Sequence, residues 1–122
     1  MNNTLNKERY TCPCCGYKTL EEYPPGTFEI CLICYWEDDN VQFENPFYEG
    51  GANTTSLYRA QHNFIKYGAS EEISMSLVRK PTVTDKRDTH FKLINAPKPW
   101  LQMFSICMRI KSLIYLLKPL KY

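Results

Sequence analysis

The sequence lacks a long uninterrupted hydrophobic run, and it has only two histidines. Its first residues, MNNTLNKERYT, are polar, so the pattern of a secretory signal peptide is missing. The apolar stretch near the C-terminus is broken by Arg109 and Lys111 and is too short to span a bilayer comfortably. Internal repeats and low-complexity tracts are missing as well. We therefore expect a cytoplasmic protein with reduced thiols.

Composition favours one small folded domain with an uneven distribution of charge. Hydrophobic residues make up 43% of the 122 residues, which suffices for a small core. Domains of this size often need a metal or disulfides for stability. Residues 1–52 carry three basic and nine acidic side chains, a net −6, whereas residues 53–122 carry twelve and four, a net +8. This asymmetry predicts different partners for the two parts, or one part covering the other.

Five of the six cysteines fall in two short stretches with a paired spacing. Cys12 and Cys15 form a C-x-x-C-G unit, and Cys31 and Cys34 form a second C-x-x-C. Two intervening residues let a tight turn point both sulfurs at one ion, and Gly16 permits the positive φ that closes the first turn. We therefore predict a four-cysteine metal site made of Cys12, Cys15, Cys31 and Cys34.

The same spacing leaves Cys14 as the spare thiol. A C-x-C spacing is less suited to placing both sulfurs of one turn on the same ion, and the side chains of adjacent cysteines tend to diverge. Structural zinc is favoured over iron because all-cysteine sites of this kind most often hold zinc. The C-x-x-C-G-Y turn followed by PPGTFE is locally similar to rubredoxin, an iron protein. However, Leu32 and Tyr35 stand where rubredoxin's second turn has proline and glycine.

Several motifs spread over residues 10–86 resemble those of one family. These are CPCCGYKTL, FEICLICYWEDDNVQFENP, GGAN, SLYRAQHNF and VRKPT. Together they resemble the cysteine-rich CPCC domain family of small bacterial proteins. The resemblance implies a zinc-ribbon domain with a helical second half and no assigned reaction.

The predicted fold is α+β: a small zinc ribbon of short antiparallel strands, followed by one or two helices and an apolar helical tail. We divide the chain into a polar arm (1–9), a zinc-ribbon domain (10–98) and a basic, apolar extension (99–122). A helix is predicted over 55–67, capped by Thr55 or Ser56 and ended by Gly68.

Two shorter elements are predicted from local patterns. Phe28, Ile30 and Leu32 alternate along the sequence, which suits a half-buried strand. Ser70 precedes two glutamates, which favours a second short helix with this serine as its cap.

We interpret the other potentially reactive side chains as non-catalytic. Glu37, Asp38 and Asp39 are interpreted as an acidic, solvated turn that caps a backbone end, in preference to an acid/base or hard-cation site. His62 or His90 could complete a catalytic zinc site, but four cysteines already fill the coordination sphere. We therefore expect a protein that is not an enzyme.

The predicted function is binding of another protein, in the role of a bacterial immunity or regulatory protein. The acidic N-terminal part suits a basic partner. One alternative is a nucleic-acid-binding zinc ribbon that uses residues 79–121, although the acidic ribbon itself would repel phosphate. The other alternative is a rubredoxin-like electron carrier.

The extension 99–122 carries too many large apolar side chains for all of them to be left exposed to water. Its polar residues Gln102, Ser105, Arg109 and Ser112 fall on one helical face. Docking on the domain or self-association is favoured over binding to a membrane surface, because the charges are few. The role of Cys107 is left open. The apolar residues are Trp100, Leu101, Met103, Phe104, Ile106, Met108, Ile110, Leu113, Ile114, Leu116 and Leu117.

Overall fold

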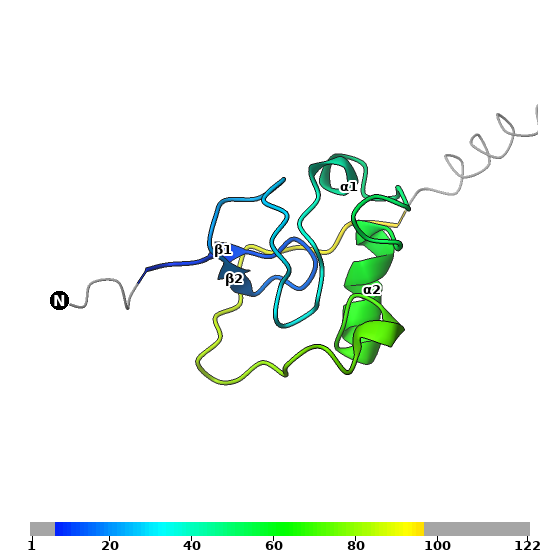
Figure 1. The fold of residues 1–122 in the computed structure, drawn as a ribbon. Coiled ribbons are helices and arrows are strands. Elements are labelled where there is room, and N and C mark those ends of the chain that lie inside the picture. Colours follow the sequence, from blue (N-terminus) through cyan, green and yellow to red (C-terminus); the bar gives the residue numbers. More distant parts are fainter. Residues whose placement is uncertain (1–6, 97–122) are drawn as a thin grey trace, which may run out of the picture.

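The computed structural model describes residues 7–96. Loops connect short regular elements and make up most of this part of the chain (Figure 1). None of its helices is long and apolar enough to cross a membrane. In chain order the elements are strands β1 (Tyr10–Thr11) and β2 (Lys18–Leu20), helices α1 (Asn40–Glu44) and α2 (Leu57–Tyr67), and the 3₁₀ helix η2 (Glu72–Ser74).

Strands β1 and β2 form a two-stranded antiparallel sheet. Tyr10 lies opposite Leu20 and Thr11 opposite Lys18, with an irregularity between the two pairs. The loop that joins the strands contains the first three cysteines. The predicted order of short antiparallel strands followed by helices is therefore confirmed for the described residues.

The strand predicted around residues 28–32 is wrong. Phe28 has a φ of 60°, which interrupts an extended backbone. Only an isolated bridge between Ile30 and Glu37 follows before the chain turns again at Cys31. Phe28, Ile30 and Leu32 consequently point outward and are exposed rather than half-buried.

Helix α2 confirms the prediction of a helix in this region, with its start at Leu57. The Ser56 hydroxyl caps it by accepting a hydrogen bond from the Arg59 N–H at 3.1 Å. Gly68 ends it in the left-handed conformation, with a φ of 76°. Leu57, Ala60 and Gln61 are its buried residues, so one polar side chain lies on the core face.

The second predicted helix is a single 3₁₀ turn, and Ser70 does not cap it. The N-terminal flanking residue of η2 is Glu71, whose side chain makes no capping bond. Ser70 is buried, and its N–H donates to the carbonyl of Cys34 at 2.7 Å. Helix α1, which the sequence analysis missed, begins after Asp39 and spans five residues.

The buried core is small and rich in sulfur. Apart from the cysteines, the core contains few large side chains. The cysteines therefore occupy much of the space that aliphatic side chains fill in larger domains. A core of this size gives limited hydrophobic stabilisation, which makes an additional cross-link valuable. The members of the cluster are Cys12, Cys14, Cys15, Leu20, Cys31, Ile33, Cys34, Trp36, Leu57 and Ala60.

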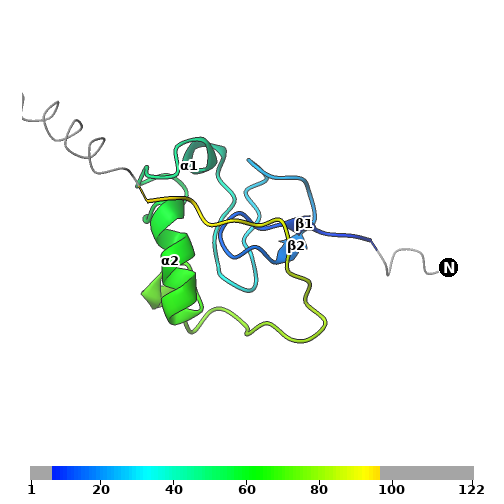
Figure 2. The ribbon, with the colours of Figure 1, turned by 180° about the vertical axis from the view of Figure 1, so that it is seen from behind.

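The last described residues return across the molecule and tie the ribbon to α2. Figure 2 shows this segment, in yellow, passing from the β1–β2 hairpin to α2. The Asp88 N–H donates to the Gly16 carbonyl at 2.8 Å, and the Ile94 N–H donates to Gln61 Oε1 at 2.8 Å. The division into arm, domain and extension stays a prediction, and the extension 99–122 lies outside the described residues.

Candidate metal centre

The first cysteine pair lies on a tight turn, which we call the first knuckle (residues 12–16). The Gly16 N–H donates to the Cys12 carbonyl at 2.9 Å, and the Cys12 N–H donates to the Tyr17 carbonyl at 2.8 Å. Gly16 has a φ of 82°, which a residue without a Cβ adopts readily. The turn thus brings Cys12 and Cys15 to the same side of the backbone.

The second pair lies on a turn with the same hydrogen bonds, the second knuckle (residues 31–35). The Tyr35 N–H donates to the Cys31 carbonyl at 2.7 Å, and the Cys31 N–H donates to the Trp36 carbonyl at 2.9 Å. Tyr35 has a φ of 70° and so takes the conformation that Gly16 has in the first knuckle. The two C-x-x-C units therefore fold alike although only one of them has a glycine.

The two knuckles bring four sulfurs together in the core. The Sγ atoms of Cys12, Cys15, Cys31 and Cys34 all lie within 4.8 Å of one another. The Cys12–Cys34 and Cys15–Cys31 sulfur pairs are 3.7 Å apart. A regular tetrahedron with metal–sulfur bonds of about 2.3 Å has edges of about 3.8 Å. The four cysteines are therefore positioned to bind a metal ion.

A disulfide does not explain this arrangement. The sulfur–sulfur separations far exceed the ~2.05 Å of a disulfide bond. The five cysteines within residues 7–96 are free. All four clustered residues are at most 1% exposed. The donor set is thus four buried soft sulfurs, which suits zinc or iron and does not suit calcium or magnesium.

Burial and close contact of the thiols favour a cation at the centre of the cluster. Burial raises the pKa of the Cys12 and Cys34 thiols well above the ordinary value. Hydrogen bonds from the thiols of Cys12, Cys15 and Cys34, and from the Thr19 hydroxyl, lower the pKa of Cys31. Four thiolates this close together in a buried site would repel one another. A divalent cation would compensate their charge and allow them to ionise.

Polar groups around the cluster orient one of its sulfurs. The Thr19 hydroxyl, from β2, donates to Cys31 Sγ at 3.1 Å. The backbone N–H of Ile33 donates to the same sulfur at 3.4 Å. Donors of this kind stabilise a thiolate ligand and fix its position. The sequence analysis did not identify Thr19, because nothing local in the sequence pairs it with a cysteine twelve residues later.

The other candidate residues are not among the four clustered sulfurs. Cys14 is buried, but it is not one of the four cysteines whose sulfurs cluster. His62 is exposed on α2 and packs against the Tyr58 ring, with centroids 4.6 Å apart. His90 is exposed and lies 3.7 Å from Asp88. Cys107 lies outside the described residues.

The acidic cluster Glu37–Asp39 supports the backbone, as a capping turn would, but two of its three carboxylates are not solvated. Asp38 and Asp39 are buried. Asp38 Oδ2 accepts hydrogen bonds from the N–H and hydroxyl of Thr27 at 2.9 and 2.8 Å. Asp39 caps α1 through the Val41 N–H and accepts from the Ala52 N–H. These two carboxylates are therefore internal and do not offer a surface patch to a partner.

Two buried glutamines, which the sequence analysis did not single out, hold the elements around the site. Gln42 is 0% exposed and donates to the carbonyls of Tyr48, Asn53 and Thr55. Gln61 donates to the Pro13 carbonyl at 2.9 Å and so links α2 to the first knuckle. The signal for Gln61 was its place on the apolar face of the predicted helix, four residues after Leu57.

The fold and the site thus define the class of protein, which is a small cysteine-rich domain with a metal centre made of two knuckles. The family model described as cysteine-rich CPCC matches residues 10–85, and the chain belongs to this family. A comparison with curated proteins found no match.

Proposed function

We propose that the protein is a non-enzymatic, zinc-stabilised protein-binding module of the cytoplasm. The burial of all four cysteines supports a structural ion, because each is at most 1% exposed and a substrate could not reach the metal. Structural zinc sites have four protein ligands, whereas catalytic sites keep one position for water or substrate. The ion would hold the two knuckles together and supply no reaction chemistry.

The observation that carries the binding role is a set of exposed apolar side chains in the second knuckle and just before it. We define the knuckle strip as Phe28, Ile30, Leu32 and Tyr35, all of which are exposed. Phe28 and Tyr35 also have positive φ values of 60° and 70°. Left-handed backbone at a residue other than glycine costs about 1–3 kcal/mol and is often found at binding sites. Exposed apolar groups in such a setting favour a protein partner.

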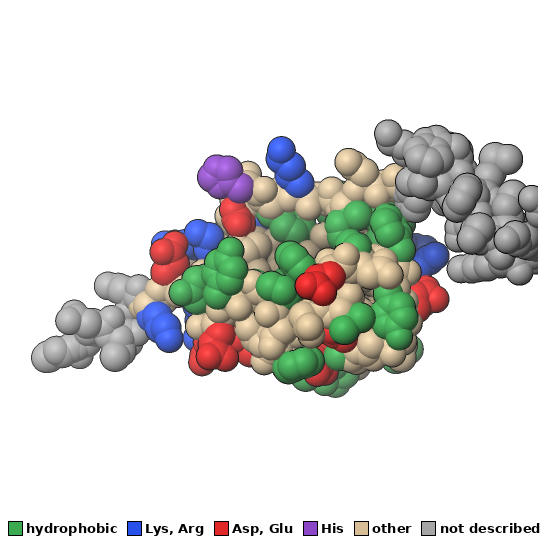
Figure 3. All heavy atoms as spheres, turned by 90° about the horizontal axis from the view of Figure 1, so that it is seen from above, with side chains coloured by type: hydrophobic (Ala, Val, Ile, Leu, Met, Phe, Trp, Pro, Cys, Tyr) green, Lys and Arg blue, Asp and Glu red, His purple; other side chains and the backbone are tan. Residues whose placement is uncertain are grey.

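Carboxylates beside this strip favour a partner with basic groups. The Glu29 carboxylate accepts hydrogen bonds from the N–H groups of Glu21 and Glu22 at 2.8 and 2.9 Å, which gathers three acidic residues, of which Glu21 and Glu22 are exposed and Glu29 is half-buried. Figure 3 shows the face on the side of α1, where hydrophobic and acidic side chains also lie side by side. A partner that combines apolar and basic groups fits an immunity or regulatory role.

The test compares two exposed apolar sites. Serine at both Phe28 and Leu32, which are 57% and 64% exposed, should leave folding and metal content intact. Ile73→Ser is the matched control, because Ile73 is 82% exposed on η2. Each chain is expressed at its native level in the cells that produce the protein. The proteins bound to it are then quantified by mass spectrometry.

We expect one stoichiometric partner with the native chain and the Ile73→Ser control, and its loss with the double variant. Equal recovery from all three chains, or no stoichiometric partner for the native chain, would contradict the proposal.

A second candidate is nucleic-acid binding, favoured by a basic hollow beside the ribbon. The hollow has a volume of about 910 Å³ and is also lined by Glu8 and Asp85. It ranks second because ion pairs with these acids already partly neutralise two of its cations. Salt-dependent binding of random DNA or RNA that weakens in a Lys7→Gln/Lys86→Gln variant would favour it. The basic residues that line it are Lys7, Arg9, Lys18, Arg79 and Lys86.

A further inference from the structure

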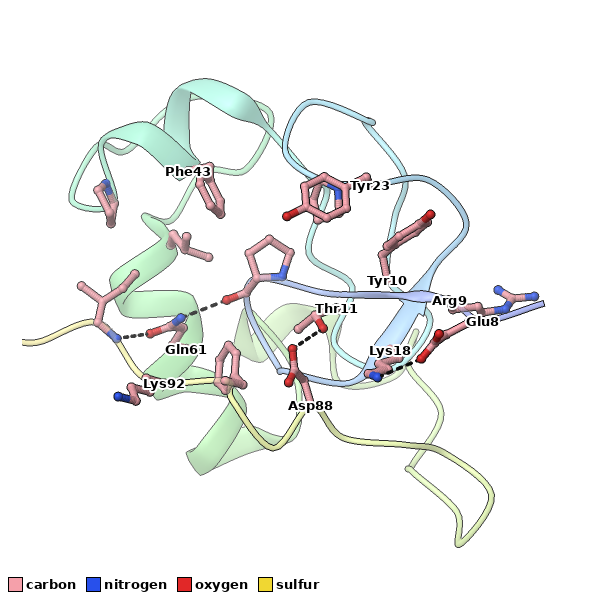
Figure 4. A pocket seen from close by; sticks show the side chains of 16 residues that line it. Glu8, Arg9, Tyr10, Thr11, Lys18, Tyr23, Phe43, Gln61, Asp88 and Lys92 are labelled. Carbon is pink, nitrogen blue, oxygen red and sulfur yellow. Dashed lines mark hydrogen bonds and ion pairs between the residues drawn. The ribbon is translucent and has the colours of Figure 1, made fainter. Parts of the chain in front are cut away.

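A second hollow, of about 630 Å³, lies where the β1–β2 hairpin, both α-helices and the last described segment meet (Figure 4). We call it the apolar groove. Its walls include Tyr10 of β1, Phe43 of α1 and Leu57 of α2. Tyr23 adds a ring that packs edge-on against Tyr10, with centroids 5.4 Å apart. Tyr23 and Phe43 are 76% and 42% exposed, so the groove presents aromatic surface to whatever enters it.

The end of the described chain forms one side of this groove. Phe91 and Ile94 line it, and the bond from the Ile94 N–H to Gln61 fixes the segment against α2. The chain therefore continues from Ala96 at the edge of the groove. Pro97, Lys98 and Pro99 follow, and the apolar stretch begins directly after them at Trp100.

We propose that the apolar groove is the docking site for Trp100 and Phe104 of this chain's own C-terminal segment. Four residues of chain reach about 14 Å, so Trp100 can enter the groove from Ala96. The two aromatic residues are four positions apart, the spacing that puts side chains on one face of a helix. Gln102, Ser105 and Arg109 would then face the solvent.

The short connection favours this occupant over a second copy of the chain. A segment tethered by three residues has an effective concentration on the order of millimolar, above that of free copies in a cell. The groove volume falls in the range of about 300–1,000 Å³ that encloses a few large groups, so it takes two aromatic side chains and not the entire extension. The aromatic side chains that meet are apolar, and docking removes them from water. Charged residues line the rest of the groove, namely Glu8, Arg9, Lys18, Asp88 and Lys92.

Tryptophan fluorescence in the full chain tests the proposal. The chain has two tryptophans, and Trp36 is 1% exposed, so a small polar quencher such as acrylamide reports mainly on Trp100. A Trp100→Phe variant gives the contribution of Trp36 for subtraction. We expect Trp100 to be protected in the native chain and to become several-fold more quenchable in a Tyr23→Ser/Phe43→Ser variant.

Controls separate docking in the groove from unfolding and from self-association. Ile73→Ser, at an exposed site on η2, should leave the protection of Trp100 unchanged. Metal content and circular dichroism verify that the groove variant is folded. Sedimentation velocity over a range of concentrations should give a monomer throughout.

Four outcomes would overturn the proposal. These are a Trp100 that is fully quenchable in the native chain, protection that survives the groove substitutions, protection that disappears on dilution together with a dimer, and protection that requires anionic lipid vesicles.

Discussion

Replacement of Gly16 by alanine should destabilise the metal-loaded protein through two separable effects. Gly16 has a φ of 82°, which costs an L-residue about 1–2 kcal/mol. A Cβ placed there would also lie 2.6 Å from Cδ2 and 2.7 Å from Cγ of the Phe91 ring. The ring would have to move, and Phe91 both lines the apolar groove and lies near the Arg87 guanidinium.

Gly68 offers a matched control for the backbone effect. Its φ is 76°, and a Cβ would meet nothing within 4 Å. Alanine there carries the same left-handed strain, offset by about 0.4–1 kcal/mol because the unfolded chain loses freedom. We expect Gly68→Ala to cost about 1 kcal/mol. Gly16→Ala should cost about 1–3 kcal/mol more, the usual range for overpacking.

The assay is urea denaturation at a fixed metal concentration, followed by circular dichroism. A double-mutant cycle with Phe91→Ala isolates the clash, because Gly16→Ala should then cost no more than Gly68→Ala. Equal free energies for the two single variants, or an excess at Gly16 that persists without the Phe91 ring, would refute the reasoning.

Three further predictions test individual contacts. Thr19→Val removes the hydroxyl that donates to Cys31 and should weaken metal affinity by about 10- to 100-fold, measured by chelator competition; unchanged affinity would refute this role. Ser56→Ala removes the cap of α2 and should cost about 1 kcal/mol in urea denaturation; a cost near zero would refute the cap. The Arg79 guanidinium holds the pKa of Asp85 well below its usual range, so this pair's stabilisation is complete above the ordinary aspartate pKa and is lost as the pH falls toward the lowered value. An NMR titration should show the pKa of Asp85 rising in Arg79→Gln, and an unchanged midpoint would contradict the pairing.

The parts of the fold that local sequence determines were predictable. A C-x-x-C spacing specifies a turn over a few residues, and both knuckles form as these spacings indicate. The end of α2 at Gly68 was predictable for the same reason, because the left-handed conformation is a local preference. The antiparallel pairing of β1 and β2 follows from the short loop between them.

The parts that depend on distant contacts were not predictable. The alternation of Phe28, Ile30 and Leu32 resembles a strand, but the positive φ at Phe28 and the following knuckle turn these side chains outward. Helix α1 is too short to show a periodic pattern, and hydrogen bonds from Gln42 to later carbonyls hold it.

Long-range polar contacts explain the misassigned acidic residues as well. Asp38 is buried because Thr27, eleven residues earlier, donates two hydrogen bonds to it. The bond from the Thr11 hydroxyl to Asp88 at 2.6 Å joins residues 77 positions apart. No local motif indicates a pairing over that distance.

The central claim is that four of the five neighbouring cysteines hold one zinc ion on which folding depends. Metal analysis by mass spectrometry, with circular dichroism on the same samples, tests it with Cys12→Ser and the matched variant Cys14→Ser. Both residues are buried in the first knuckle, but only Cys12 has its sulfur in the cluster of four. Structural zinc contributes about 10–16 kcal/mol in zinc-finger peptides, so Cys12→Ser should lose the ion and most secondary structure. Cys14→Ser should retain both, with one zinc per chain. Equal loss of metal from the two variants, or a red native protein that contains iron, would contradict the account.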